Sequence, residues 1–388
     1  MINHVRIPRI SAAVLALAAA AHGLAMNVPY DYFVPLTPEN AILGHFSSTK
    51  KPVLVVKSGA VVKINGGGGN GRGDDPVKFL NDNHIPITEE TLTCMKESAA
   101  VREQTPKLSG PGFGHLMVGP IYIEDAEPGD SLEIRILDVT PRLTFGNTGS
   151  APGRGGLALG SPLPPENRNR GATPALSVPR PSGHITILDV KRNVGIFSNG
   201  IEVPLKPFMG VMATCPPDSE GPDRSSTAPG AFGGNLDCSE LTTGSTLYLP
   251  VFQKGALFYT GDSHALQGDG EVTGTAIETA DACTLQFILH KGKTLKMPRA
   301  ETPMYYIQFG LNPDLNLAMK QAIEESIIFL KETRGMDILE SYPLCSIAVS
   351  YRVTQVVDRT LGVHGMMAKR IFPNEPNTYW YSPPLLPL

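Results

Sequence analysis

The sequence has no Cys-x-x-Cys pair, no Gly-x-Ser-x-Gly motif and no basic run, and each absence argues against one class of protein or site. Without Cys-x-x-Cys, a structural zinc site built from cysteines is disfavoured. Without Gly-x-Ser-x-Gly, the signature of the common serine hydrolases is missing. The net charge of −4 argues against nucleic acid and anionic membranes as partners. No internal repeat is present, and after residue 25 no segment is long and apolar enough to cross a bilayer, so we expect no integral membrane protein.

The first 25 residues have the pattern of a secretory signal peptide. A charged start, "MINHVRIPR", precedes a short apolar core, "ISAAVLALAAAA", and small residues follow. We expect cleavage near Ala25 and a periplasmic or secreted protein, with an uncleaved membrane anchor as the alternative. The five cysteines are an odd number for an exported chain, which allows one or two disulfides and a free thiol, in a pairing that the sequence leaves open.

A glycine-rich stretch near residue 70 reads "NGGGGNGRGDDP". It lacks the Lys-Ser/Thr ending of a phosphate-binding loop, and no clear helix follows, so nucleotide binding is disfavoured. Its Arg-Gly-Asp, residues 72–74, is interpreted as a turn rather than as an adhesion motif.

Most of the chain has the pattern of short strands separated by glycine and proline. Residues 52–64 predict a first strand, and residues 119–139 predict a hairpin around a Pro-Gly-Asp turn. Six further strand signals follow between residues 184 and 292, at a spacing typical of a sandwich or barrel. Residues 141–182 lack periodicity and predict a long loop. We therefore expect a mainly β body over residues 26–280.

The pattern changes near the C-terminus. Apolar residues recur every three or four positions over residues 312–335, where Asn312 or Asp314 can cap a helix and Gly335 can end it. A shorter helix over residues 337–348 and the strand "YRVTQVVD" are expected next. Residues 281–388 thus form a smaller α+β part.

Residues 260–278, "TGDSHALQGDGEVTGTAIE", carry the densest group of chemical side chains. Asp262 and His264 are two apart on an expected strand and so point to the same face. A hairpin turn at Asp269-Gly270 would bring Glu271 and then Glu278 back beside them. Mixed carboxylate and imidazole ligands suit zinc, whereas an all-oxygen set would suit calcium. A plain surface turn remains the alternative.

Two further clusters are candidates. In "GGNLD", Asn235 and Asp237 are again two apart and follow two glycines, although, taken alone, this pattern favours an Asx turn. His115 in "GFGHLMVGP" is a single histidine, which is more often structural than a ligand.

These segments together resemble the acetamidase/formamidase family. The resemblance rests on "TLYLPVFQKGALFYTGDSHALQGDGEVTGTAIE", on "GGNLD", on "GPIYIEDAEPGDSLEIRILD", and on "YRVTQVVD" followed by "GVHGMMAKRIF". It extends from about residue 50 to residue 372. It implies a mostly β fold, bound divalent cations, a homo-oligomer, and hydrolysis of the carbon–nitrogen bond of a small amide to a carboxylic acid and ammonia or an amine. His115 lies four residues before the family's Gly-Pro, and the acidic clusters match its Gly-Gly-Asn-x-Asp and Gly-Asp-x-His-x-x-Gln-Gly-Asp-Gly-Glu.

We therefore expect a water activated by a divalent metal, zinc or alternatively calcium, to attack the amide. Glu271 is assigned as general base, and His115 and Gln267 as further catalytic groups. The expected metal ligands are Asp262, His264, Asp237, Asn235, Asp269 and Glu278. The loop 141–182 and the export signal depart from the family pattern and favour a larger, aryl or external amide as substrate.

Two hypotheses of other classes remain. Cys215 or Cys238 could act as a nucleophile, although no partner base is apparent for either. The acidic cluster could instead hold a structural calcium in a non-enzymatic binding protein.

Overall fold

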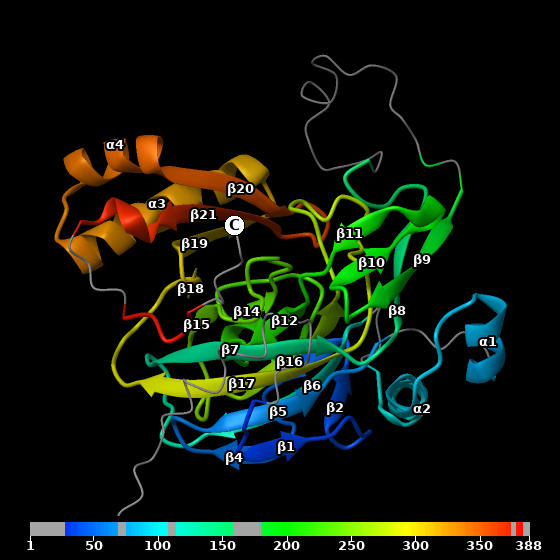
Figure 1. Ribbon diagram of the computed structural model, residues 1–388. Helices are drawn as coiled ribbons and strands as arrows, with labels where there is room; N and C mark the ends of the chain where they lie inside the picture. The colour runs from blue at the N-terminus through cyan, green and yellow to red at the C-terminus, as the bar shows by residue number, and fades with distance from the viewer. Residues whose placement is uncertain are drawn as a thin grey trace, which may run out of the picture.

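The structure is a computed structural model of the chain, and it describes residues 28–68, 75–107, 114–157, 178, 180–373 and 378–382. The expected signal peptide, the Arg-Gly-Asp at 72–74 and half of the expected loop 141–182 lie outside these residues. The expected fold class is confirmed: strands dominate, and two helices pack against the C-terminal strands (Figure 1). Among the described residues, no helix is long and apolar enough to cross a membrane.

Two large sheets form the body. The nine-stranded sheet runs, in spatial order, β1 (Tyr32–Val34), β5 (Val61–Asn65), β17 (Asp281–His290), β7 (Ser131–Pro141), β15 (Thr246–Pro250), β18 (Arg299–Glu301), β19 (Tyr305–Asn312), β21 (Leu361–Ala368) and β20 (Val349–Gln355). The six-stranded sheet runs β14 (Gly233–Asn235), β12 (Phe208–Ala213), β16 (Phe258–His264), β6 (Leu116–Ile123) and β2 (Ala41–Leu43), with β4 (Leu54–Val56) also on β6.

The main core lies between these two sheets. Phe258 of β16 meets Phe287 of β17 edge to face, with ring centroids 4.9 Å apart. Val118 and Ile121 of β6 belong to the same buried cluster as Ile134 of β7. Facing apolar strands of this kind define a β-sandwich, because each sheet buries one face against the other.

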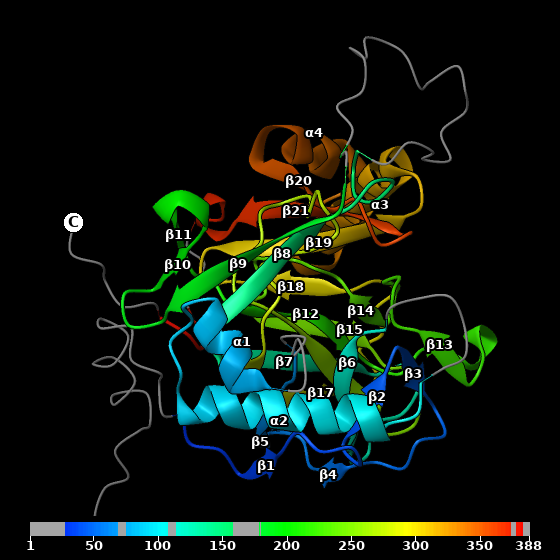
Figure 2. The same cartoon turned by 90° about the vertical axis from the view of Figure 1, so that its right-hand side faces the viewer.

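Smaller elements flank the sandwich. A four-stranded sheet contains β11 (Glu202–Pro204), β10 (Val194–Ile196), β9 (Ser182–Asp189) and β8 (Phe145–Ser150), and β13 (Asp223–Ser225) pairs with β3 (His45–Ser47). Helices α1 (Pro76–Asp82) and α2 (Glu89–Gln104) lie beside it in Figure 2. Short 3-10 turns occupy Ser198–Gly200, Asp218–Glu220 and Lys369–Ile371.

Several local predictions were wrong. Within the expected loop 141–182, Phe145–Ser150 form strand β8. Residues 119–139 form no hairpin, because β6 and β7 belong to different sheets, which the largely exposed turn between them connects. Residues 52–64 form two strands, β4 and β5, in different sheets. A helix, α1, follows the glycine-rich stretch: Asp75 caps it, and Pro76 occupies its first turn, where a missing N–H costs nothing.

The C-terminal helices are confirmed. Helix α3 (Leu315–Arg334) is capped by Asp314 and ends at Gly335 in the left-handed conformation, and α4 (Ile338–Ala348) leads directly into β20. Helix α3 approaches β19 closely, because a Cβ on Gly310 would lie 2.0 Å from the Ala318 carbonyl oxygen. The nine-stranded sheet contains strands from both sides of residue 280, so the sandwich and the α+β part share one hydrogen-bonded sheet.

Candidate active site

Three adjacent strands of the six-stranded sheet bring the first group of acidic side chains together. Strand β12 lies between β14 and β16, since Val211 pairs with Asn235 on one side and with Gly261 on the other. Asp237 follows the end of β14, and its N–H donates to the carbonyl oxygen of Gly210 on β12. A Cβ on Gly210 would lie 2.3 Å from Asp237 Oδ1 and 2.8 Å from Asp262 Oδ2. The glycine therefore leaves the space into which the two carboxylates converge.

His264 lies at the centre of this group. Its Nε2 is 3.4 Å from Asp262 Oδ2 and 3.4 Å from Glu278 Oε1, while its Nδ1 is 3.8 Å from Asp237 Oδ1. The ring is buried, with its edge or face against Phe208. Burial lowers the pKa of His264, but the negative charges of Glu278 and Asp262 raise it by more, so its pKa lies well above the usual value. The imidazole is therefore held between carboxylates on both of its nitrogens.

The expected strand after Glu271 does not form. The chain from Glu271 to Thr279 forms no strand, but near its end an antiparallel bridge joins Glu278 to His264, and the N–H of Thr279 donates to the Ser263 carbonyl oxygen. This bridge still delivers the Glu278 carboxylate to the imidazole, and the N–H of Ala276 binds Glu278 Oε1 at 2.8 Å. The predicted neighbourhood is thus present without the predicted hairpin.

His115 approaches from the start of β6. Its Nε2 is 3.8 Å from Asp262 Oδ2, and its Nδ1 is 3.0 Å from the hydroxyl of Ser226. Burial raises the pKa of Asp262, but His115 and His264 lower it more strongly, to well below its usual range. Asp262 is therefore ionised at any physiological pH.

A carboxylate that the sequence did not identify completes the site. Asp358 lies in the turn between β20 and β21 and joins Asp237 and Glu271 in a group whose ligand atoms lie within 4.8 Å of one another. Gln355 holds this turn: its Oε1 accepts the N–H groups of Val357 at 2.9 Å and Asp358 at 3.1 Å. Its Nε2 donates to the Thr360 carbonyl oxygen at 2.6 Å. The only sequence signal for Asp358 was its place in "YRVTQVVD".

Backbone hydrogen bonds join the loop that carries Glu271 to the same turn. The N–H of Gly270 donates to the carbonyl oxygen of Thr354, and the N–H of Val356 donates to that of Gly270. The nine-stranded sheet therefore supplies Asp358 directly and holds Glu271 through Gly270.

The buried carboxylates carry more negative charge than the two histidines can balance. Burial, reinforced by Asp358, raises the pKa of Glu271 to about 9, and burial raises that of Asp358 to about 6. Burial also raises the pKa of Asp237, with Glu271 as the next cause. Each shift shows that a further positive charge would be favourable at this place, because a buried anion is costly without a counter-charge.

Several buried polar atoms of the site lack a hydrogen-bond partner. They are Asn235 Oδ1, Asp237 Oδ1, His264 Nδ1, Gln267 Oε1, Glu271 Oε2 and Asp358 Oδ2. Buried polar atoms are rarely left unpaired in native proteins unless a water, ion or ligand binds them. Together with the space beside Gly210, these atoms fit a divalent cation and a polar substrate.

The backbone at the site is strained. Asp237, Asp262 and Glu271 have φ values of 45°, 58° and 41°, a left-handed region that residues with a Cβ rarely occupy. Such conformations persist only where the surrounding structure enforces them, and they cluster at functional sites. Three strained carboxylates within one buried group mark this place as functional.

The structure places three other predicted site residues less centrally. Asp269 lies outside the three groups of converging ligand atoms, and its carboxylate is near the Ser239 hydroxyl and Arg352 instead. The amide nitrogen of Gln267 donates to the Asp237 carbonyl oxygen at 2.6 Å, so it supports the Asp237 segment. The Asn235 amide nitrogen donates to the Thr227 carbonyl oxygen, which leaves its Oδ1 available.

The five cysteines are all free and buried, and no described pair forms a disulfide. Burial raises the pKa of Cys215 to about 12 and that of Cys238 still further. A thiol that stays protonated is a poor nucleophile. The cysteine route is therefore disfavoured.

Comparisons with known proteins show similarity to one family. A sequence model of the Acetamidase/Formamidase family matches residues 219–374. A formamidase of Methylophilus methylotrophus is 29% identical over 289 residues, which are 56% of this chain and 67% of that protein. An acetamidase of Mycolicibacterium smegmatis is 29% identical over 233 residues, 46% of this chain and 54% of that protein, so the alignments span about half to two thirds of these relatives. The crystal structure of an acetamidase from Bacillus halodurans superposes with a TM-score of 0.66 at 27% identity, covering 87% of this chain and 98% of that one.

Proposed function

The chain belongs to the acetamidase/formamidase family, a family of hydrolases acting on linear amides, and from that premise we propose a cation-dependent amidase whose site is built around His264. The reaction is hydrolysis of the carbon–nitrogen bond of an amide to a carboxylic acid and ammonia or an amine. One observation carries the proposal: ligand atoms of Asp237, Asp262 and His264 converge in a buried space that Gly210 keeps open.

The donor set favours one class of cation. Asp237, Asp262 and His264 would hold it, with Glu278 or Glu271 near enough to contribute. One imidazole among carboxylates suits zinc better than calcium, which takes oxygen ligands alone. A divalent cation at this place would polarise the amide carbonyl and lower the pKa of a bound water to about 7.

The protein's own residues carry the proton transfers. Glu271 is the proposed general base, because its Oε2 is buried without a hydrogen-bond partner and the residue belongs to two of the three groups of converging ligand atoms, one with His264 and one with Asp358. It would take a proton from the attacking water and return it to the nitrogen as the carbon–nitrogen bond breaks. Asp358 extends from the nine-stranded sheet toward Glu271 and Asp237. After burial, its negative charge is the next cause that raises the pKa of Glu271.

His115 and Asn235 are the proposed substrate contacts. When the Ser226 hydroxyl donates to Nδ1 of His115, the neutral imidazole carries its proton on Nε2 and can donate a hydrogen bond from there. Asn235 Oδ1 is buried and unpartnered, so it can accept from the amide NH₂ of the substrate. These two groups would orient the amide for attack.

Export remains part of the proposal. Residues 1–25 have the composition of a signal peptide, and an exported amidase would meet amides from outside the cytoplasm. Fractionation of cells that express the whole chain, beside a chain without residues 2–25, tests this. Activity of the whole chain in the cytoplasmic fraction alone would contradict export.

The experiment that tests the reaction is ammonia release from a panel of aliphatic, aryl and peptide-like amides, with and without chelator. Asp262→Asn is expected to lose at least about 100-fold in kcat/KM, because it removes a charged ligand. Asp269→Asn is the matched control: it changes the same charge on the same segment but lies outside the converging groups, and is expected to stay within about threefold. Full turnover by a folded, cation-free chain, or equal losses in both variants, would overturn the proposal.

A further inference from the structure

A cavity of about 530 Å³ lies on the outer face of the nine-stranded sheet. Successive side chains of a strand point to opposite faces of a sheet. Leu132 and Ile134 of β7 belong to the core between the two sheets, so Glu133 and Arg135, which line the cavity, point outward. None of the described residues that line the cavity belongs to the groups of converging ligand atoms, which lie where the two sheets meet. The cavity is therefore separate from the candidate active site.

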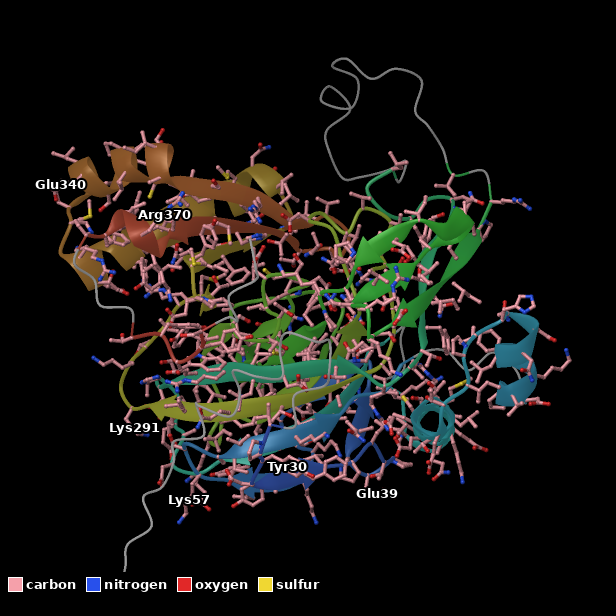
Figure 3. All side chains as sticks on the ribbon, viewed as in Figure 1. Tyr30, Glu39, Lys57, Lys291, Glu340 and Arg370 are labelled. Atoms are coloured by element: carbon pink, nitrogen blue, oxygen red, sulfur yellow. The ribbon has the colours of Figure 1, made fainter. Side chains whose placement is uncertain are left out.

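Three parts of the chain line this cavity. They are the outward side of β7, β15, β18 and β19, the turn that follows β21, and the described residues 378–380 near the C-terminus. Figure 3 shows Arg370 in that turn, at the end of β21. Much of the lining is aromatic and consists of Tyr248, Tyr306, Phe372, Tyr379 and Trp380. Ligand sites commonly combine a volume of roughly 300–1,000 Å³ with aromatic walls and a few well-placed charges, and this cavity has all three.

Hydrogen bonds hold the aromatic residues near the C-terminus against the sheet. Thr246 of β15 is fully buried, and its Oγ1 lies 2.9 Å from the Tyr379 hydroxyl and accepts the Trp380 indole N–H at 2.8 Å. The Tyr379 hydroxyl also donates to the Glu301 carbonyl oxygen at 3.1 Å. These side chains are therefore already ordered, so a ligand that binds beside them would cost little further conformational entropy.

The two carboxylates of the cavity are paired within the chain. The Arg135 Nε donates to Glu133 Oε1 at 2.6 Å, and Lys369 Nζ lies 2.7 Å from Glu301 Oε2. Arg370 forms no hydrogen bond or ion pair with any described residue, and the two terminal nitrogens of Arg135 have no described hydrogen-bond partner. The lining thus has three basic side chains against two acidic ones, and the open guanidinium groups favour an anion.

We propose that this cavity is a second ligand site of the protein and that it binds a small aromatic carboxylate. Arg370 would bind the carboxylate, since a planar guanidinium pairs with a carboxylate through two parallel hydrogen bonds, and the terminal nitrogens of Arg135 are further donors. The ring of the ligand would pack among the aromatic side chains of the lining. One surplus positive charge matches a monoanion, whereas Glu133 and Glu301 would repel the second charge of an aryl phosphate.

Tryptophan fluorescence tests this proposal directly, because Trp380 is the only tryptophan of the chain and it lines the cavity. Titration of the purified full chain with benzoate is expected to change the Trp380 emission, with a dissociation constant below about 1 mM. Four comparison molecules each lack one feature of the proposed ligand: acetate has no ring, benzyl alcohol no charge, benzylamine the opposite charge, and phenyl phosphate a second negative charge. Each is expected to bind at least about tenfold more weakly than benzoate.

Replacing one arginine tests where the carboxylate binds. Arg370→Ala is expected to raise the dissociation constant for benzoate at least about tenfold. The residue is exposed, so the variant is expected to fold and to keep its far-ultraviolet circular dichroism. Arg192→Ala is the matched control, because it removes another exposed arginine, in the turn between β9 and β10, and it is expected to change the dissociation constant by less than about twofold.

Benzoate is also the acid that hydrolysis of an aryl amide would release, so binding at the candidate active site has to be separated from binding at this cavity. Asp262→Asn lies outside the cavity and is expected to keep the native dissociation constant for benzoate. Native affinity in Arg370→Ala, loss of benzoate binding in Asp262→Asn, or a comparison molecule that binds as tightly as benzoate would each overturn the proposal. The measurement needs no turnover, so its outcome is independent of the proposed amidase reaction.

Discussion

Adding a side chain at Gly210 is the most specific test of the site. In Gly210→Ala, the new Cβ would lie 2.3 Å from Asp237 Oδ1, 2.8 Å from Asp262 Oδ2 and 3.0 Å from His264 Cε1. An ordinary contact to carbon is about 3.4 Å, so the Asp237 carboxylate must move by about 1 Å, and a displacement of that size can cost about 100-fold in rate. Gly210 is not in the left-handed region, so its backbone accepts alanine.

The expected result is a loss confined to the site. We expect kcat/KM for ammonia release to fall about 100-fold and cation affinity, measured by isothermal titration calorimetry, to fall at least tenfold. The free energy of unfolding is expected to change by no more than about 2 kcal/mol, since overpacking is partly offset by the lower entropy of the unfolded chain. Gly183→Ala on β9 is the control, because its Cβ would have no neighbour within 4 Å. A Gly210→Ala chain with native kcat/KM and native cation affinity would refute the reasoning.

Three further predictions follow from the same geometry. Gln355→Ala removes the hydrogen bonds that hold the turn carrying Asp358, so kcat is expected to fall about tenfold or more with a smaller change in KM. Steady-state kinetics, with Gln286→Ala as the control, measures this. In chelated protein the pKa of Glu271 is about 9, whereas in the unfolded chain it is 4.5. The folded chain therefore binds one more proton between these values, and the free energy of unfolding falls as the pH rises toward 9. Calorimetry is expected to show Tm falling over that range, and a flatter profile in Glu271→Gln. Cys215→Ala and Cys238→Ala are each expected to keep kcat/KM within about threefold, and a thiol reagent is expected to leave the folded native chain unlabelled.

Local sequence signals predicted the elements that depend on local physics. Helix α3 was predicted with its cap and its end because Asp314, Gly335 and the apolar period act within the helix itself. Helix α1 has equally local signals in Asp75 and Pro76, but the short apolar pattern after them was too weak to identify it. The 119–139 segment failed for a different reason, since the partners of β6 and β7 lie in different sheets and a turn motif cannot specify them.

The site shows the same difference between features set by local sequence and features set by long-range contacts. The two-residue spacing of Asp262 and His264 correctly predicted that they meet, since β16 extends to His264. The convergence of Asp237 on them depends on β12 lying between their strands and on a glycine at position 210, which no spacing along the chain reveals. Asp358 is about 120 residues from Asp237, and only the fold brings the two together.

The location of the site links its chemistry to the stability of the fold. Asp237, Asp262 and His264 belong to the six-stranded sheet, whereas Asp358 extends from a turn of the nine-stranded sheet, so the acidic group lies where the two sheets meet. A cation held by this group would join the sheets and offset the burial and the repulsion that raise the pKa of Asp237 and Glu271. A ligand bound only by the folded chain adds about 2.7 kcal/mol of stability at 100 times its dissociation constant. Cation removal should therefore lower Tm as well as activity, and Asp358→Asn, which leaves Asp262 and His264 in place, should reduce that loss of Tm.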